Sequence, residues 1–248
     1  MKQGHSLFLI AALVVGTQAW SQDFNIDVGQ PGSQPHPWYA AAGQRGVWNS
    51  VTGAHITPFT PGPTPQDDIL VDIYGNPTSV GFHQFGGMDL VSANDPSVSG
   101  EDAELMNDYL ATHSANLENC MYLNGLQNGT YEVLTYAWMP NSTFTRQLVR
   151  FDFHPDTYLV GGVWNGQHLE GVTFSRHIVE VTNGRIGFHS GIPSGGMINP
   201  GAAFNGAQIR LLTGVPTFGG WHVALLFGAV ATAGGILRRR RMAIRYRH

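Results

Sequence analysis

The sequence contains little charge, and almost none of it is lysine. Charged residues make up 12% of the 248 residues, Lys2 is the only lysine, and half of the twelve arginines lie in the last eleven residues. Between Gln22 and Gly214, six arginines stand against all 17 acidic residues, a net formal charge of −11. Because an acidic stretch of this kind repels phosphate backbones, we expect no nucleic-acid partner.

Cysteine is nearly absent as well. Cys120 is the only cysteine, so no intrachain disulfide can form, and we expect this residue to be a small thiol buried in the core. The chain also lacks the Gly-x-Ser-x-Gly nucleophile elbow, a phosphate-binding glycine loop and the His-Glu-x-x-His spacing of zinc hydrolases. These absences favour a protein that is not an enzyme.

The first 21 residues have the three parts of a secretory signal. Lys2 supplies a positive start, Leu7 to Val15 form an apolar run, and Ala19-Trp20-Ser21 place small residues at the cleavage positions. We therefore expect residues 1–21 to be a signal peptide that is cleaved before Gln22. The alternative, an N-terminal anchor, is disfavoured because the run is too short to span a bilayer as a helix.

The last 34 residues, 215–248, have a second ordered arrangement. The short motif Val215-Pro216-Thr217 precedes an apolar stretch from Trp221 to Leu237, which predicts a transmembrane helix at about residues 218–237. A basic cluster follows it, formed by Arg238, Arg239, Arg240 and Arg241. Positive flanks stay in the cytoplasm, so this orientation places the rest of the chain outside the cell.

This order of parts resembles the IPTL-CTERM class of sorting tail, a relative of the PEP-CTERM signals. The resemblance implies recognition by an exosortase-like membrane enzyme, cleavage near the short motif and delivery to the cell surface. Val215 and Phe218 depart from the usual isoleucine and leucine. A plain transmembrane anchor is the alternative.

Turn-forming and aromatic residues dominate the middle of the chain. With 32 glycines, 14 prolines and 11% aromatic residues, residues 22–214 favour a single domain of many short strands. Three of the Asn-Gly pairs mark turns beside predicted strands. One precedes a strand over Thr130–Trp138, one follows a strand over Tyr158–Trp164, and one joins His177–Val181 to Arg185–Phe188 as a hairpin.

Two further patterns concern individual elements of this domain. Thr130–Trp138 carries apolar residues on both faces, which predicts a central strand in a two-layer sandwich. Acidic residues in the first turn and apolar residues at helical spacing predict one short helix from Glu101 to about Ala115, capped by Ser99 or Gly100.

Several stretches together resemble the galactose-binding-domain-like jelly rolls of the malectin-like kind. They are the Ile26–Gly29 opening, Asn124–Val133, Phe151–Phe153, Val179–Gly184 and Phe204–Ile209. The resemblance implies an all-β jelly-roll sandwich, a fold with frequent carbohydrate-binding members. It implies no particular binding residue, because sites on this fold differ between members.

Sugar sites combine an aromatic platform with amide, carboxylate or histidine groups. The residues near loops that offer this combination are Trp38, Tyr39, Trp164, Asn165 and His168. Each of these is also open to the interpretation of a core residue. For metal, hard oxygen donors suggest a structural calcium ion, with Asp27, Asp67, Asp68 and Asp72 as weak candidates.

The sequence thus predicts an exported, membrane-anchored or surface-sorted module that binds an extracellular glycan without catalysis. One alternative is a structural protein of an extracellular matrix, which acts through cation bridging. The other is a polysaccharide hydrolase, which needs two carboxylates about 5 to 10 Å apart.

Overall fold

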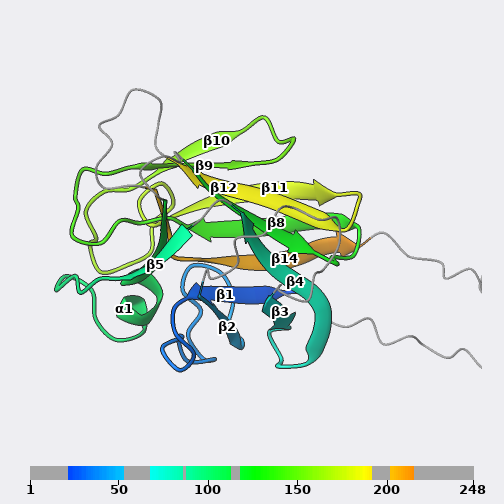
Figure 1. The fold of residues 1–248 in the computed structure, drawn as a ribbon, viewed down its shortest axis with the longest axis horizontal. Coiled ribbons are helices and arrows are strands. Elements are labelled where there is room, and N and C mark those ends of the chain that lie inside the picture. Colours follow the sequence, from blue (N-terminus) through cyan, green and yellow to red (C-terminus); the bar gives the residue numbers. More distant parts are fainter. Residues whose placement is uncertain (1–21, 53–67, 86–87, 113–117, 192–201, 215–248) are drawn as a thin grey trace, which may run out of the picture. The chain divides into compact units, whose positions relative to one another are not determined.

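The computed structural model describes residues 22–52, 68–85, 88–112, 118–191 and 202–214 (Figure 1). The predicted signal peptide and sorting tail lie outside these ranges. In chain order the elements are β1 (Phe24–Val28), β2 (Trp48–Val51), β3 (Asp68–Val71), β4 (Pro77–Phe85), β5 (Met88–Ser92), α1 (Glu101–Met106), β6 (Asp108–Thr112), β7 (Glu118–Asn124), β8 (Gly129–Tyr136), β9 (Gln147–Phe151), β10 (Thr157–Val160), β11 (Phe174–Val181), β12 (Arg185–Gly191), β13 (Ala203–Phe204) and β14 (Gly206–Gly214).

The strands form two large sheets and one small one. The first has the order β11-β8-β14-β1-β2, the second β10-β9-β12-β7-β4-β3, and the small sheet β13-β6-β5. Strand β1 runs parallel to β2, whereas the neighbours within the second sheet all pair antiparallel. The described part of the chain is therefore an all-β sandwich with one short helix, as the sequence predicts.

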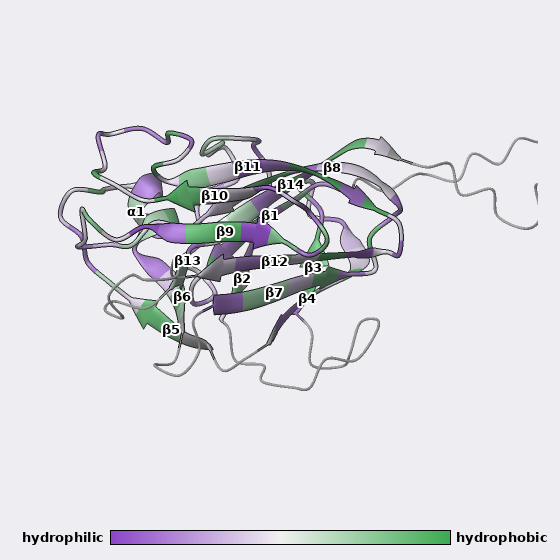
Figure 2. Ribbon diagram, turned by 90° about the horizontal axis from the view of Figure 1, so that it is seen from above, coloured by the Kyte–Doolittle hydropathy of each residue, from purple (hydrophilic) through white to green (hydrophobic). Residues whose placement is uncertain are grey.

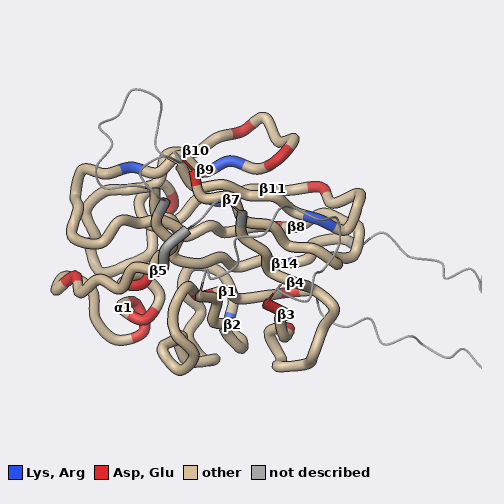
Figure 3. The backbone as a smooth tube through the Cα atoms, viewed as in Figure 1, with Lys and Arg blue, Asp and Glu red and all other residues tan. Residues whose placement is uncertain are grey.

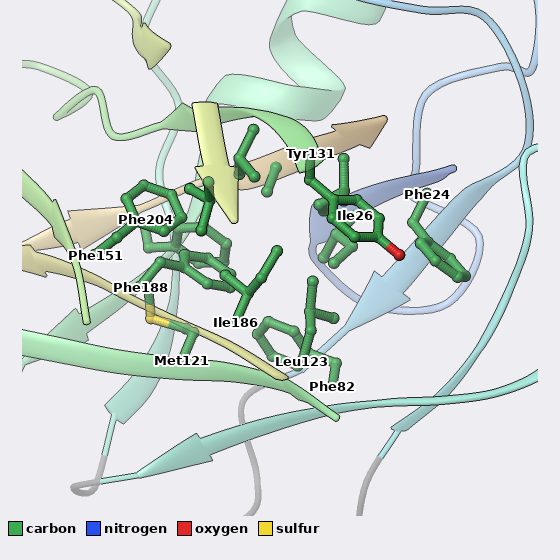
Figure 4. Packing of buried hydrophobic residues seen from close by; sticks show 14 of the residues in the cluster. Phe24, Ile26, Phe82, Met121, Leu123, Tyr131, Phe151, Ile186, Phe188 and Phe204 are labelled. Carbon is green, nitrogen blue, oxygen red and sulfur yellow. The ribbon is translucent and has the colours of Figure 1, made fainter. Parts of the chain in front are cut away.

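The core lies between the two large sheets (Figure 4). Phe24 and Ile26 of β1 and Tyr131 of β8 come from the first sheet, and Phe82 and Phe188 come from the second; all five are at most 2% exposed. Phe204 packs its ring on both of these phenylalanines, with centroids 6.3 Å and 5.5 Å away. Burial of these rings is the main source of stability in a domain that has no disulfide.

Strand β8 buries both of its faces. Tyr131 and Val133 belong to the core between the sheets, whereas Leu134 and Tyr136 belong to a second cluster beside α1, which Trp138 joins two residues after the strand ends. Strand β8 also lies between β11 and β14 in its sheet. The predicted central strand is confirmed, since a strand with apolar residues on both faces needs cover on both.

Other strands have one buried face. In β9, Gln147, Val149 and Phe151 are buried and the residues between them are half-buried. This alternation of burial is what a strand with one face toward the core requires. Figure 2 shows a hydrophobic segment in β9 between two hydrophilic ones.

The predicted helix over Glu101–Ala115 is too long. Helix α1 ends at Met106, and the chain then continues as strand β6, which pairs with β5 and β13. Leu105 and Met106 already bury the apolar face of the helix, and Leu110 enters the sandwich core from a strand instead. Tertiary pairing outweighs the weak helical periodicity of this stretch.

Two strand predictions also need correction. The strand predicted over Tyr158–Trp164 ends at Val160, because Gly161 and Gly162 adopt φ angles of 148° and 144°. The predicted hairpin at Asn183-Gly184 is a turn between sheets, because β11 pairs with β8 and β12 pairs with β7 and β9. Both strands direct apolar residues at the same core, so they face each other across it.

Candidate functional site

The structure brings together three of the five predicted sugar-contact residues. The Tyr39 hydroxyl donates to Asp102 Oδ1 at 2.5 Å and lies 2.7 Å from His168 Nε2. The Trp164 ring meets the His168 ring edge-on, with centroids 5.3 Å apart. We call Tyr39, Trp164 and His168 the aromatic pin, because they join two loops that are distant in the sequence, one before β2 and one before β11.

The polar groups of the aromatic pin are already used within the protein. His168 Nδ1 lies 3.2 Å from the hydroxyl of Thr173, and the indole of Trp48 donates to the Tyr39 carbonyl. Burial lowers the pKa of His168, while burial and Asp102 raise the pKa of Tyr39. A sugar hydroxyl would find few free partners here.

The other two predicted residues, Trp38 and Asn165, remain exposed. Trp38 is 56% exposed beside the ring of His36. A shallow cleft of about 400 Å³ is lined by His36, Trp48 and the α1 carboxylates Glu101 and Glu104. Trp38 is not part of this lining, although its neighbours in the sequence are. Figure 3 shows the acidic residues gathered on α1.

A larger cleft of about 490 Å³ lies where the turn after β9 approaches β11 and β12. We call it the β11–β12 cleft. Its lining includes Asp152, Phe153, His154, Glu180, Asn183 and Arg185. These are the aromatic, carboxylate, amide and guanidinium groups that a sugar site requires, and they come from three segments of the chain.

Phe153 is the most unusual residue of this cleft. Its side chain is fully exposed, and its φ of 61° lies in the left-handed region that phenylalanine rarely adopts. The turn is held by hydrogen bonds from Asp152 N to Gly187 O at 2.9 Å and from His154 N to Phe151 O at 3.3 Å. An exposed ring on a strained backbone contributes little to folding, so its presence here points to contact with another molecule.

The polar groups of the cleft are held in place by neighbouring residues. Arg185 lies 3.6 Å from Asp152 and stands over the Tyr122 ring, 4.6 Å from its centroid. His154 Nε2 lies 3.2 Å from the Ile178 carbonyl. Glu180, at the end of β11, and Asn183, in the turn that follows, are both exposed.

Sequence reasoning missed this cleft because Phe151-Asp152-Phe153 alternates like a strand. In the structure the strand ends at Phe151 and the next two residues form a turn. The available signal was Pro155, which together with His154 marks a break in the chain.

The predicted calcium ligands do not form one site in the described residues. Asp72 accepts hydrogen bonds from the backbone of Tyr74 and Asn76 and so closes a turn. Asp68 begins β3, and Asp67 lies outside the described residues.

Asp27 remains as a possible cation ligand. It is fully buried, and neither carboxylate oxygen has a hydrogen-bond partner among the residues that the structure describes. Its Oδ2 and Asp108 Oδ2 lie 3.2 Å and 3.1 Å from the position that a Cβ on Gly29 would take, with Ser33 Oγ at 2.6 Å. Burial, Asp108 and Glu104 raise the pKa of Asp27. These oxygen donors around an unpartnered carboxylate fit a calcium ion.

Cys120 is not a buried core thiol. It is half-buried and alternates with the core residue Met121, so it lies on the outer face of the second sheet with Glu118. Its sulfur lies 3.2 Å from His189 Nδ1. Burial and Glu118 raise the pKa of the thiol to about 11, which disfavours a free nucleophilic thiolate at neutral pH.

Comparisons with known proteins assign no family to this chain. No protein-family model matches the chain, and no curated protein matches it. Among solved structures, β-glucuronidase 2 of Bacteroides uniformis is 12% identical with a TM-score of 0.40, over 77% of this chain and 18% of its own. The plant receptor-like kinase ANX2 gives the same identity, TM-score and coverage of this chain, over 48% of its own.

An exo-β-1,3-galactanase of Phanerochaete chrysosporium is 16% identical with a TM-score of 0.31, over 52% of this chain and 27% of its own. The chain thus spans less than half the length of each of these proteins. At these identities and TM-scores, none of the three carries a function to this chain.

No helix of the described ranges is long and apolar enough to cross a membrane. The apolar stretch Trp221–Leu237 lies outside them.

Proposed function

We propose that this protein is an exported, non-catalytic surface module that binds carbohydrate in the β11–β12 cleft. The observation that carries the proposal is the exposed ring of Phe153, which stands on a left-handed backbone in the lining of that cleft. A sugar presents a C–H face that packs on an aromatic ring, and hydroxyl edges that pair with fixed polar groups. The cleft offers both kinds of contact.

The charge of the cleft favours a neutral glycan. Asp152 and Glu180 place two carboxylates in the lining against the one guanidinium of Arg185, which is itself paired with Asp152. A uronic acid or sulfated sugar would meet net repulsion there. Neutral hexose oligosaccharides are therefore the expected class of ligand.

Binding without hydrolysis is the simpler use of these groups. Asp152 already contacts Arg185 and His189 Nε2, so partners within the protein hold this carboxylate. The proposal predicts that a bound oligosaccharide is recovered intact after long incubation with the protein.

A glycan array probed with the full chain tests the proposal, followed by calorimetric titration of the oligosaccharides that bind. Phe153→Ala should weaken binding by about five- to thirtyfold, the effect of removing an aromatic anchor worth 1 to 2 kcal/mol. Phe144→Ala is the matched control, since Phe144 is also almost fully exposed but lies outside the cleft lining. A blank array with folded protein, or equal losses in the two variants, contradicts the proposal.

A second variant separates binding from folding. Phe153→Gly keeps the left-handed turn without strain, so it should be about 1 kcal/mol more stable than Phe153→Ala while binding equally poorly. Melting curves of the two variants measure this difference.

The proposed location rests on the two ends of the chain. The apolar run before Gln22 and the Val215-Pro216-Thr217 tail with its arginine cluster support export and sorting by an exosortase-like enzyme, with the sandwich outside the cell. A calcium ion held by Asp27, Asp108 and nearby oxygens would stabilise the domain at the end of β1.

A further inference from the structure

Three potential metal ligands meet on the outer face of the second sheet. Glu118 and Cys120 are two residues apart on β7, so their side chains share one face. His189 on β12 pairs directly with Cys120 in the strand register. The strand pairing thus gathers residues that lie 69 positions apart in the chain.

The distances between the ligand atoms suit a tetrahedral ion. His189 Nδ1 lies 3.2 Å from Cys120 Sγ and 3.6 Å from Glu118 Oε2, and the three ligand atoms all lie within 4.8 Å of one another. With Zn–S near 2.3 Å and Zn–N near 2.0 Å, neighbouring ligand atoms of a tetrahedral zinc ion are roughly 3.3 to 3.6 Å apart. The side chains therefore need only small movements to bind one.

A fourth residue prepares the histidine for metal. His189 Nε2 lies 2.8 Å from Asp152 Oδ1, so a proton on Nε2 donates to the carboxylate and Nδ1 keeps its lone pair toward Cys120 and Glu118. Metal-binding histidines are usually oriented by a carboxylate in this way. A Cβ at Gly187 would lie 2.2 Å from Asp152 Oδ2, so only glycine there lets this carboxylate reach the imidazole.

A cation already occupies the neighbourhood of the ligands. The Arg150 guanidinium donates to Glu118 from Nε at 2.9 Å and from Nη2 at 2.5 Å, and Nη2 lies 3.5 Å from His189 Nδ1. The Arg150 side chain is one-third exposed and can turn outward to water, whereas the His189 side chain is 6% exposed and fixed. The cluster therefore accepts positive charge at the point where an ion would lie.

We infer that Glu118, Cys120 and His189 bind a divalent transition metal of the zinc type, with Asp152 as the positioning residue for His189. A set of sulfur, nitrogen and oxygen donors selects zinc or its neighbours over calcium and magnesium, which prefer oxygen alone. On binding, the metal–sulfur bond forms, the thiol proton passes to solvent, and Arg150 leaves Glu118. Water fills the fourth position. The inference does not rest on sugar binding, although Asp152 also lines the β11–β12 cleft.

Cobalt(II) titration of the full chain, reduced and stripped with chelator, tests the site directly. Because Cys120 is the only cysteine, a thiolate-to-cobalt charge-transfer band can come from no other residue. We expect that band, with the strong visible absorption of four-coordinate cobalt, at one ion per chain, and its loss on adding excess zinc. No band, or one ion shared by two chains, would overturn the inference.

Four variants divide the roles. His189→Gln should abolish the band, and Asp152→Asn should weaken affinity by about 10- to 100-fold. Arg150→Gln should strengthen affinity by about five- to tenfold, because it removes a competing and partly exposed ion pair. Tyr122→Phe, on the same face of β7, is the control and should change nothing. Unchanged affinity in His189→Gln, or weaker binding in Arg150→Gln, would contradict the assignment.

Alkylation of Cys120 is measured in the unmutated chain, so a variant that fails to fold cannot affect the result. Zinc should slow the reaction with iodoacetamide by more than tenfold, and calcium at the same concentration should leave it unchanged. Equal rates with and without zinc would count against the site.

Discussion

At the scale of single residues, the sandwich contains groups that folding alone does not favour. Phe153 is exposed on a left-handed backbone, and Asp27 is buried with both oxygens unpartnered within the described ranges. His177 is buried too, with its ring beside those of Phe151 and Tyr158. Each costs stability, so each makes a measurable prediction.

His177 predicts a loss of stability in acid. Its ring packs on Phe151 and Tyr158, and burial, together with the neighbouring His154, lowers its pKa to about 4, against the opposing effect of Asp156. The unfolded chain takes up the proton first as pH falls below about 6.5, so the free energy of unfolding declines between about 6.5 and 4, by on the order of 2 to 3 kcal/mol.

His177→Phe, which keeps an aromatic ring without a titrating group, should flatten this part of the pH profile. Urea unfolding at a series of pH values measures the difference between the two proteins. Parallel profiles for variant and parent would show that His177 is not the cause.

Asp27 predicts a stabilising effect of calcium. Without a cation the buried carboxylate opposes Asp108 and Glu104, so Asp27→Asn should raise the free energy of unfolding in EDTA at neutral pH by about 1 to 3 kcal/mol. With calcium the unmutated chain should gain stability and the variant should not. Melting curves in EDTA and in calcium test this, and an equal calcium shift in both proteins contradicts it.

At the scale of elements, a few specific contacts hold loops and strands together. The aromatic pin ties the loop before β2 to α1 and to the loop before β11, and β11 and β12 join the two sheets at the β11–β12 cleft. The cleft therefore has rigid walls, because β11 and β12 are each paired within a different sheet.

Tyr39→Phe tests the aromatic pin. It removes the hydroxyl between Asp102 and His168 and leaves both without that partner, so the free energy of unfolding should fall by about 1 to 2 kcal/mol. Glycan affinity should stay unchanged, because the pin lies outside the lining of the β11–β12 cleft. Lost binding with unchanged stability would instead make Tyr39 a sugar contact.

At the scale of the whole molecule, the sequence predicts the layers better than the sites. The two apolar faces of β8 can be recognised from the residues of that strand alone, so its central position could be predicted. The end of α1 and the sheet assignment of β12 depend on pairing partners elsewhere. The meeting of Cys120 with His189 is a consequence of strand register and leaves no trace in local spacing.

The location of the chain makes its own prediction. If the ends act as proposed, the protein recovered from intact cells lacks residues 1–21, and an external protease degrades the sandwich. Arg238→Glu combined with Arg239→Glu should reduce correct sorting, because the positive flank sets the orientation. Fractionation with an antibody to the sandwich measures this, and intact chain free in the cytosol would contradict it.

The most direct test of carbohydrate binding in the β11–β12 cleft is hydrogen–deuterium exchange of the full chain with an oligosaccharide selected on the array. Binding in this cleft should slow exchange in peptides covering residues 152–154 and 178–187. Protection confined to residues 34–39 and 164–168, or none at a saturating concentration, would contradict it.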